Sequence, residues 1–380
     1  MLYYLLYSLR GYIPPFRVFQ YITFRTAAAY LTALVICLML GPWLIRRLRE
    51  FQIGQQIRED GPSSHKSKAG TPTMGGILVL VGILVPSLLW GNLRNLYLWI
   101  AWTATLGFGL VGFLDDYSKI TRKQSLGITG KAKLVFQTLI ALGVCAALFQ
   151  LSLRGLYSTR LSVPFFKNFT PELDLWHPLG VPLPVPLTLF VVFVLVGASN
   201  TVNLTDGLDG LAAGCVIVAA SALTILSYVT GHARLADYLD LIHNPYASEL
   251  PIFCGAMVGA ATGFLWYNAY PAQIFMGDSG ALPLGGALAW LAVVSKQELA
   301  LPLAGSVFVL DLGTSFLQTF WYKRTRRRLF TMAPIHHGLQ RYGGVFVARE
   351  QGWHEVKVVV RFWIVAACGA TASLALLKLR

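Results

Sequence analysis

The sequence predicts an all-α polytopic membrane protein with about ten transmembrane helices. Of its 380 residues, 55% are hydrophobic and only 13% are charged, whereas about 25% of the residues in an ordinary soluble domain are charged. The mean hydropathy is +0.59, and long apolar runs recur along the whole chain. So few charged residues cannot cover a globule of this size in water, which excludes a soluble fold.

Ten apolar runs approach the length of about 20 residues that a helix needs to cross a bilayer. They are centred on 24–45, 73–90, 97–114, 134–151, 186–203, 211–230, 251–269, 281–295, 301–322 and 358–377. Residues 152–185 are too polar to span, and six prolines fall within 164–186, so we expect a folded or hairpin-like outer loop there. Residues 1–380 are interpreted as a single integral membrane domain.

The basic residues predict the orientation. Lys and Arg number 31 against 17 Asp and Glu, and 20 of the 31 fall in loops on one side of the predicted membrane. That side should be cytoplasmic, which places both termini outside. The net charge of +14 is therefore attributed to topology and anionic partners, not to nucleic acid. The five cysteines lie in apolar runs without C-x-x-C spacing, so neither disulfides nor a zinc site are expected, and the first twenty residues do not resemble a cleaved signal.

Five aspartates lie at the cytoplasmic ends of the predicted spans. Asp115 and Asp116 occur in GFLDDYSK, Asp206 and Asp209 in NTVNLTDGLDG, and Asp278 in FMGDSG. Acidic residues at membrane depth are costly and usually mark a site for protons, ions or substrate. Three loops distant in sequence are therefore predicted to form one polar site at the cytoplasmic edge.

Local spacing refines this prediction. If NLTDGLD is helical, Asn203, Asp206 and Asp209 share one helix face, and Gly207 and Gly210 allow a ligand or a neighbouring backbone to approach closely.

The adjacent pair Asp115 and Asp116 would diverge by about 100° on a helix, so that one can face a metal while the other meets a second group. Clustered carboxylates repel without a cation, and Mg²⁺ suits such hard oxygen ligands.

Cationic residues surround the acids in the cytoplasmic loops. HKSKAGTPTMGG places His65, Lys66 and Lys68 before a helix start whose free backbone N–H groups could receive an anion. Further cations and imidazoles follow at Lys119, Arg122, Lys123, Lys131, Lys133, His336 and His337. Acids for a metal beside cations for phosphates indicate chemistry that joins or splits phosphates. Asp311 lies within a predicted span, where a functional and a structural role have equal weight.

Six motifs of the sequence resemble those of a known family. YITFR, SKAGTPTMGG, GFLDDYSK, NTVNLTDGLDGLA, WYNAYPAQIFMGDSG and MAPIHHG occur in this order, as in the phospho-N-acetylmuramoyl-pentapeptide transferase (MraY) family of polyprenyl-phosphate N-acetylhexosamine-1-phosphate transferases. The resemblance covers nearly the whole chain. It departs at Gly338, where the family usually has a third consecutive histidine, and at Asp311, where it usually has Glu.

The resemblance implies roles for individual residues. Asp115 and Asp116 would be the essential acid pair, one of them deprotonating the acceptor phosphate, and Asp278 would bind Mg²⁺ together with them. His337 would act beside these catalytic acids and contact phosphate. The substrate-binding set would comprise Lys68, Thr73, Lys123, Lys133, Asn203, Asp206, Asp209, Asn268, Phe275 and His336, with Phe275 stacking on uracil.

The implied reaction is Mg²⁺-dependent transfer of phospho-MurNAc-pentapeptide from UDP to undecaprenyl phosphate, giving lipid I and UMP in the first membrane step of peptidoglycan synthesis. The resemblance also implies a homodimer in the bacterial cytoplasmic (inner) membrane. Direct transfer and a phospho-enzyme on Asp115 or Asp116 both fit these residues. The lipid chain would occupy an apolar groove formed where the ninth span breaks near Gly313.

Two alternatives remain at this stage. The nearer is a sibling transferase that uses UDP-GlcNAc or another UDP-hexosamine with the same lipid. The more remote is an ion-coupled transporter, although transporter acids lie near the bilayer midplane and these lie at one edge.

Overall fold

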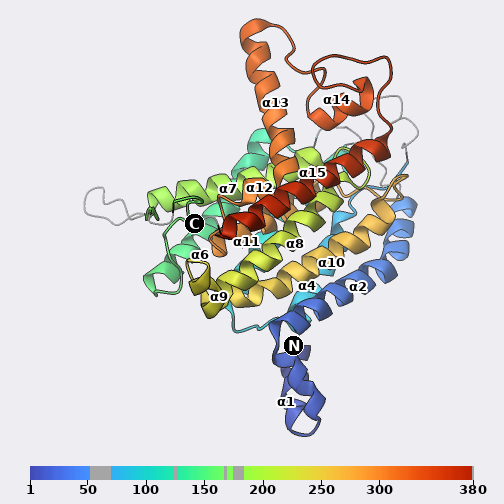
Figure 1. Cartoon of the computed structure of the whole chain (residues 1–380). Coiled ribbons are helices and arrows are strands. Elements are labelled where there is room, and N and C mark those ends of the chain that lie inside the picture. The colour runs from blue at the N-terminus through green and yellow to red at the C-terminus, as the bar shows by residue number, and fades with distance from the viewer. Residues whose placement is uncertain (52–69, 123–126, 167–168, 174–183, 379–380) are drawn as a thin grey trace.

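The computed structural model describes residues 1–51, 70–122, 127–166, 169–173 and 184–378, and Figure 1 shows a bundle of helices. Within this described part, ten helices have at least 15 residues, and each overlaps one of the ten predicted runs. They are α2 (Ile22–Glu50), α4 (Gly76–Trp90), α5 (Leu96–Thr121), α6 (Gly130–Leu153), α7 (Val185–Thr205), α8 (Leu211–Gly231), α10 (Leu250–Asn268), α11 (Asp278–Val294), α13 (Ser306–Thr325) and α15 (Glu355–Ala375).

The all-α polytopic class is confirmed. Seven helical segments are long and apolar enough to cross a membrane, and α4 and α11 are shorter apolar helices. The described residues contain no strand, and an isolated antiparallel bridge joins Arg160 to Glu172. The count of ten spans and the outward position of both termini stay predictions.

Helix α11 is the centre of the bundle. Every residue from Ser279 to Val294 is buried, because α4, α5, α7 and α8 all pack against this helix. Its many glycines and alanines permit that close packing, since small side chains let neighbouring backbones approach. The helix that begins with Asp278 is therefore surrounded by protein.

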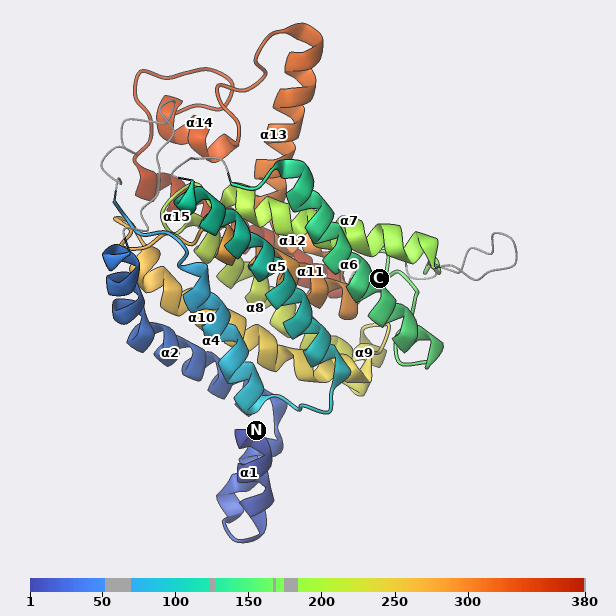
Figure 2. The same ribbon diagram turned by 180° about the vertical axis from the view of Figure 1, so that it is seen from behind.

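Different parts of the chain extend from the two ends of the bundle. The N-terminal helix α1 (Leu2–Ser8) projects from one end, and the far end of α13 with α14 (Ile335–Tyr342) extends from the other, in both Figure 1 and Figure 2. The chain reverses after α13 because Gln318 Oε1 accepts hydrogen bonds from the N–H groups of Leu329 and Phe330, at 3.0 and 2.9 Å. This reversal returns α14 toward the bundle.

The break in the ninth apolar segment differs from the prediction. A short helix, α12 (Leu301–Ala304), ends at Gly305, and α13 begins at Ser306 and continues through Gly313 without interruption. The expected break near Gly313 is therefore wrong. One glycine inside a helix costs only about 1 kcal/mol, and a helix with satisfied backbone hydrogen bonds on both sides tolerates it.

The proline-rich segment 152–185 is hairpin-like where it is described, and its location outside the membrane stays a prediction. The N–H of Leu161 donates to the carbonyl of Pro171 at 2.8 Å, and Arg160 pairs with Glu172 at 2.5 Å. Two strand-like stretches thus run antiparallel without forming a sheet.

A buried ion pair joins α2 to the segment before α10. Both Nη atoms of Arg25 donate to the carboxylate of Glu249 at 2.8 Å, and Nη1 also donates to the carbonyl of Trp90 at 3.2 Å. The Arg25 side chain is only 2% exposed, so each charge depends on the other for compensation.

Replacing Arg25 by Met should destabilise the protein by about 3–5 kcal/mol, because the buried Glu249 carboxylate loses its partner. The double variant Arg25→Met/Glu249→Met should recover most of this loss, since it buries no charge. Thermal unfolding in detergent measures both effects. Equal stability of the single variant and the parent would contradict the prediction.

Candidate active site

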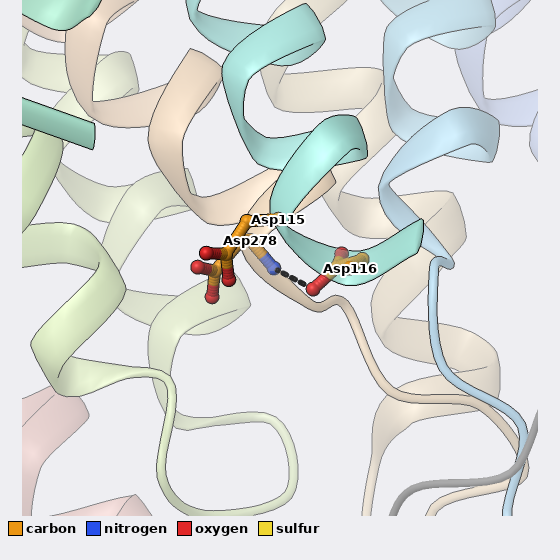
Figure 3. A group of neighbouring side chains, drawn as sticks. All are labelled: Asp115, Asp116 and Asp278. Atoms are coloured by element: carbon orange, nitrogen blue, oxygen red, sulfur yellow. Dashed lines mark hydrogen bonds between the residues drawn. The ribbon is translucent and has the colours of Figure 1, made fainter. Parts of the chain in front are cut away.

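Three carboxylates meet at one end of the bundle. Asp115 and Asp116 belong to α5 and Asp278 is the first residue of α11, and one oxygen of each lies within 4.8 Å of the others. Figure 3 shows Asp115 and Asp278 side by side, with Asp116 facing the loop that leads into α11. Asp115 and Asp116 are only 3% and 2% exposed. The structure thus brings together the three residues that the sequence analysis assigns to a metal.

Two glycines allow this approach. A Cβ at Gly112, one helical turn before Asp115 and Asp116, would overlap the carbonyl oxygen of Asp278. Gly277 has φ +71° and its missing Cβ leaves room for the Asp116 carboxylate. Glycine adopts this left-handed conformation without a steric penalty. Close contact between α5 and the start of α11 therefore requires both residues.

Asp116 caps α11. Its carboxylate accepts hydrogen bonds from the N–H groups of Asp278 at 3.2 Å, drawn dashed in Figure 3, and Ser279 at 2.9 Å. These groups have no partner within the helix, and a negative charge also favours this end of the helix dipole. Asp116 thus meets a second group, as the predicted divergence of the pair requires, while Asp115 accepts from the N–H of Ile128 at 3.0 Å.

Two lysines neutralise the carboxylates. The Nζ atom of Lys119 lies 2.6 Å from an oxygen of Asp115 and 3.4 Å from oxygens of both Asp116 and Asp278. Lys133 Nζ contacts Asp278, and the amide of Asn203 donates to the other oxygen of Asp278 at 2.7 Å. The sequence analysis placed Lys119 only among the loop cations; its spacing of three and four residues from the acid pair was the available signal.

Asp206 and Asp209 are outside the group of three carboxylates. Helix α7 ends at Thr205, so the predicted common helix face of Asn203, Asp206 and Asp209 is wrong; Asp206 has a non-helical backbone that leads into the glycine-rich turn. Burial, followed by the negative charges of Asp278 and Asp116, raises the pKa of Asp206 to about 7.

Asp209 connects loops. Its carboxylate accepts a hydrogen bond from the N–H of Ala272 at 3.0 Å, and its own N–H donates to Glu355 at 2.8 Å. Glu355, at the start of α15, was not singled out by the sequence analysis, and no motif marked it. Here Asp209 holds the turn after α7 against the segment after α10.

The predicted nucleotide-sugar residues are placed in a tightly hydrogen-bonded region. The Asn268 amide accepts from the N–H of Gly210 at 3.0 Å and donates to the carbonyl of Ile274 at 2.9 Å, and Asn268 is 3% exposed. Asn268 therefore braces the backbone, since both ends of its amide are engaged. Thr73 lies beside Gly277, with its Oγ1 3.1 Å from the position of a Cβ there.

The start of α4 is not an open anion site. The N–H of Gly75 donates to the carbonyl of Phe275 at 2.8 Å, and the N–H of Gly76 donates to that of Met276 at 2.9 Å. The expectation of free N–H groups is wrong at these two positions, because the segment before α11 pairs with them. Lys68 and Lys123 lie outside the described residues.

The two histidines approach the glycine turn from α14. The ring centroids of His336 and His337 are 4.3 Å apart. A Cβ placed on Gly207 would lie 2.7 Å from Nε2 of His336 and 2.9 Å from Nε2 of His337. The close approach predicted at Gly207 is thus made by imidazoles. At Gly338 a Cβ would lie 2.9 Å from the carbonyl oxygen of Met332, so this position packs against backbone.

The three-carboxylate group fits a divalent cation. Its donors are hard carboxylate oxygens, which Mg²⁺ prefers, and two ammonium groups compensate only part of the charge of the three carboxylates. A site that attracts cations in this way is consistent with Asp115, Asp116 and Asp278 as metal ligands.

Comparisons with known proteins identify the family of this chain. The profile described as Glycosyl transferase family 4 matches residues 98–296, more than half of the chain, and the phospho-N-acetylmuramoyl-pentapeptide-transferase signature 1 matches residues 68–80. Curated phospho-N-acetylmuramoyl-pentapeptide-transferases from Koribacter versatilis and Solibacter usitatus are each 52% identical, and that from Acidobacterium capsulatum is 53% identical, over the full length of both chains.

The helical bundle and these matches thus define an integral membrane glycosyl transferase, a glycosyl-1-phosphate transferase. Within this class the chain belongs to the phospho-N-acetylmuramoyl-pentapeptide-transferase family.

Replacing Gly112 by Ala should lower turnover by about 100-fold, because the new methyl group pushes the start of α11 away from α5 and misplaces Asp278. Gly143→Ala in α6 is the matched control, since a Cβ there meets no atom within 4 Å. Steady-state assays of both purified variants test this. Similar activity of the two variants would refute the close-contact requirement.

Proposed function

We propose that the acidic end of the bundle transfers phospho-MurNAc-pentapeptide from UDP-MurNAc-pentapeptide to undecaprenyl phosphate, forming lipid I and UMP in peptidoglycan synthesis. The observation that carries this proposal is the meeting of Asp115, Asp116 and Asp278 with Lys119 and Lys133. Such a site can receive two phosphate-bearing substrates together with a cation. Membership of the transferase family supports the choice of substrates.

The residues of the site address the main barrier of this reaction. Both substrates are anions, so the difficulty lies in bringing their phosphates together. Lys119 and Lys133 supply positive charges for the phosphate oxygens, and Asn203 and the capped start of α11 hold Asp278 in place. His336 and His337 reach the same region at Gly207, where we propose that they contact the donor.

Mg²⁺ is proposed as the cofactor, with Asp278, Asp115 and Asp116 as its ligands. When bound, it would supply Lewis-acid stabilisation of negative charge on the diphosphate. The acceptor is itself a phosphate anion, so the site needs little proton removal, and an acid of the pair would take up any remaining proton.

The remaining proposals concern partners and location. We propose that the acidic end faces the cytoplasm, that the protein lies in the bacterial cytoplasmic membrane, and that it forms a homodimer. The lysine- and arginine-rich loops support the orientation. The acids lie at helix ends, where the lipid phosphate would be located while its chain stays among apolar surroundings.

Substituting Asn for Asp115, Asp116 or Asp278 should each lower turnover by at least about 100-fold without loss of membrane insertion, because each change removes a charge at the reacting centre. Asp237→Asn, an exposed position on α9 (Ala233–Tyr238), should leave turnover unchanged. The assay follows lipid product from UDP-MurNAc-pentapeptide and from UDP-GlcNAc, with and without Mg²⁺. Consumption of UDP-GlcNAc alone would assign the chain to a sibling donor specificity.

Exchange of labelled UMP into the donor, dependent on Mg²⁺ and lipid phosphate, provides the complementary measurement. A transferase should catalyse this exchange, because it reverses the proposed reaction. A transporter would show none.

Lys119→Gln should bind a divalent cation about tenfold more tightly than the parent, since the Lys119 ammonium lies where it competes for the three carboxylates. The same variant should lose thermal stability without Mg²⁺ and regain it when Mg²⁺ is added. Lys131→Gln, an exposed lysine of α6, is the control. Equal cation affinity in the three proteins, measured with Mn²⁺ by electron paramagnetic resonance, would contradict this competition.

A further inference from the structure

A buried pair of a carboxylate and an imidazole, outside the three-carboxylate group, joins α13 to α14. The Nδ1 atom of His336 lies 2.9 Å from Oδ2 of Asp311, and both side chains are 0% exposed. Neither Oδ1 of Asp311 nor Nε2 of His336 has a hydrogen-bond partner among the described residues. A polar pair so completely buried, with one ring nitrogen left over, fits a functional orientation better than simple packing.

The remaining nitrogen of His336 faces the glycine turn after α7. A Cβ at Gly207 would lie 2.7 Å from His336 Nε2, and Gly207 directly follows Asp206. The absence of a side chain at Gly207 is what lets the imidazole come so close. Nε2 therefore lies at the loop whose acids neighbour the three-carboxylate group.

The Asp311 carboxylate beside Nδ1 of His336 determines whether Nε2 donates or accepts a hydrogen bond. It accepts the Nδ1–H hydrogen bond, which fixes the ring orientation and the tautomer, so that Nε2 carries the lone pair in the neutral ring. The same carboxylate stabilises the ring when Nε2 takes a proton. The role of Nε2 is thus set by a residue 25 positions earlier in the chain.

We propose that Asp311 is a positioning residue that holds His336 with its Nε2 directed at a polar group of the nucleotide-sugar donor. This inference rests on the proposed function of the site. Asp311 itself touches no substrate and acts through His336. It is distinct from the cation-binding carboxylates because it lies on another helix and pairs with an imidazole.

A double-mutant cycle tests the proposal. Asp311→Asn and His336→Gln should each lower kcat/KM for UDP-MurNAc-pentapeptide by about 10- to 100-fold. The double variant should fall no further than the worse single variant, because both changes remove the same directed nitrogen. Asp311→Glu keeps the charge and should recover activity to within about tenfold of the parent, which a role in packing alone would not produce.

Glu249→Gln is the matched control, since it disturbs a different buried ion pair, that of Glu249 with Arg25. It should lower the thermal midpoint and leave kcat/KM within twofold. Multiplicative losses in the double variant, or an Asp311→Asn variant within twofold of the parent, would overturn the inference while leaving the proposed function intact. Absence of transfer by the unsubstituted chain would overturn both.

If Asp311→Asn fails to accumulate in the membrane, comparing the activities of Asp311→Glu and His336→Gln still tests the inference. Asp311→Glu with the activity of His336→Gln overturns the inference, and recovery well above it supports the inference.

Discussion

The contact between the last turns of α5 and the first residue of α11 is the constraint on which the candidate active site depends. Gly112 and Gly277 have no side chains, so the two backbones can approach each other. The Asp116 carboxylate lies in the space at Gly277 and caps α11. The same contact brings Asp278 to Asp115. Packing, helix capping and ligand geometry are therefore properties of one junction, and a change in any of them alters the other two.

This junction concentrates negative charge inside an apolar bundle, and the surrounding groups make that arrangement tolerable. An isolated carboxylate in a low-dielectric interior is strongly disfavoured. Here Lys119 and Lys133 supply counter-charges, and Asn203 and the first N–H groups of α11 supply hydrogen bonds. In the proposed function, a cation and phosphate-bearing substrates exchange with these partners, so the polar site is stable before they bind.

The composition and the apolar runs were sufficient to predict the helices, because bilayer thickness sets their length and their hydropathy. The common location of Asp115, Asp116 and Asp278 also followed from sequence, since alternation of spans places these acids at one edge. Contacts made by tertiary packing did not follow. The turn at Asp206, the break at Gly305, and the use of the Asn268 amide to brace backbone depend on neighbours from distant segments. Asp311 could be noticed as a buried acid, but its partner on α14 required the fold.

The Asp116 carboxylate occupies the amino end of α11. In many nucleotide-binding proteins the amino end of a helix stays open, and its main-chain N–H groups bind a phosphate. In this protein ammonium groups on long flexible stems remain for that purpose. In the proposed transfer such groups would follow their anions as the diphosphate linkage of the donor breaks and that of the lipid product forms, and the helices need not move during the exchange.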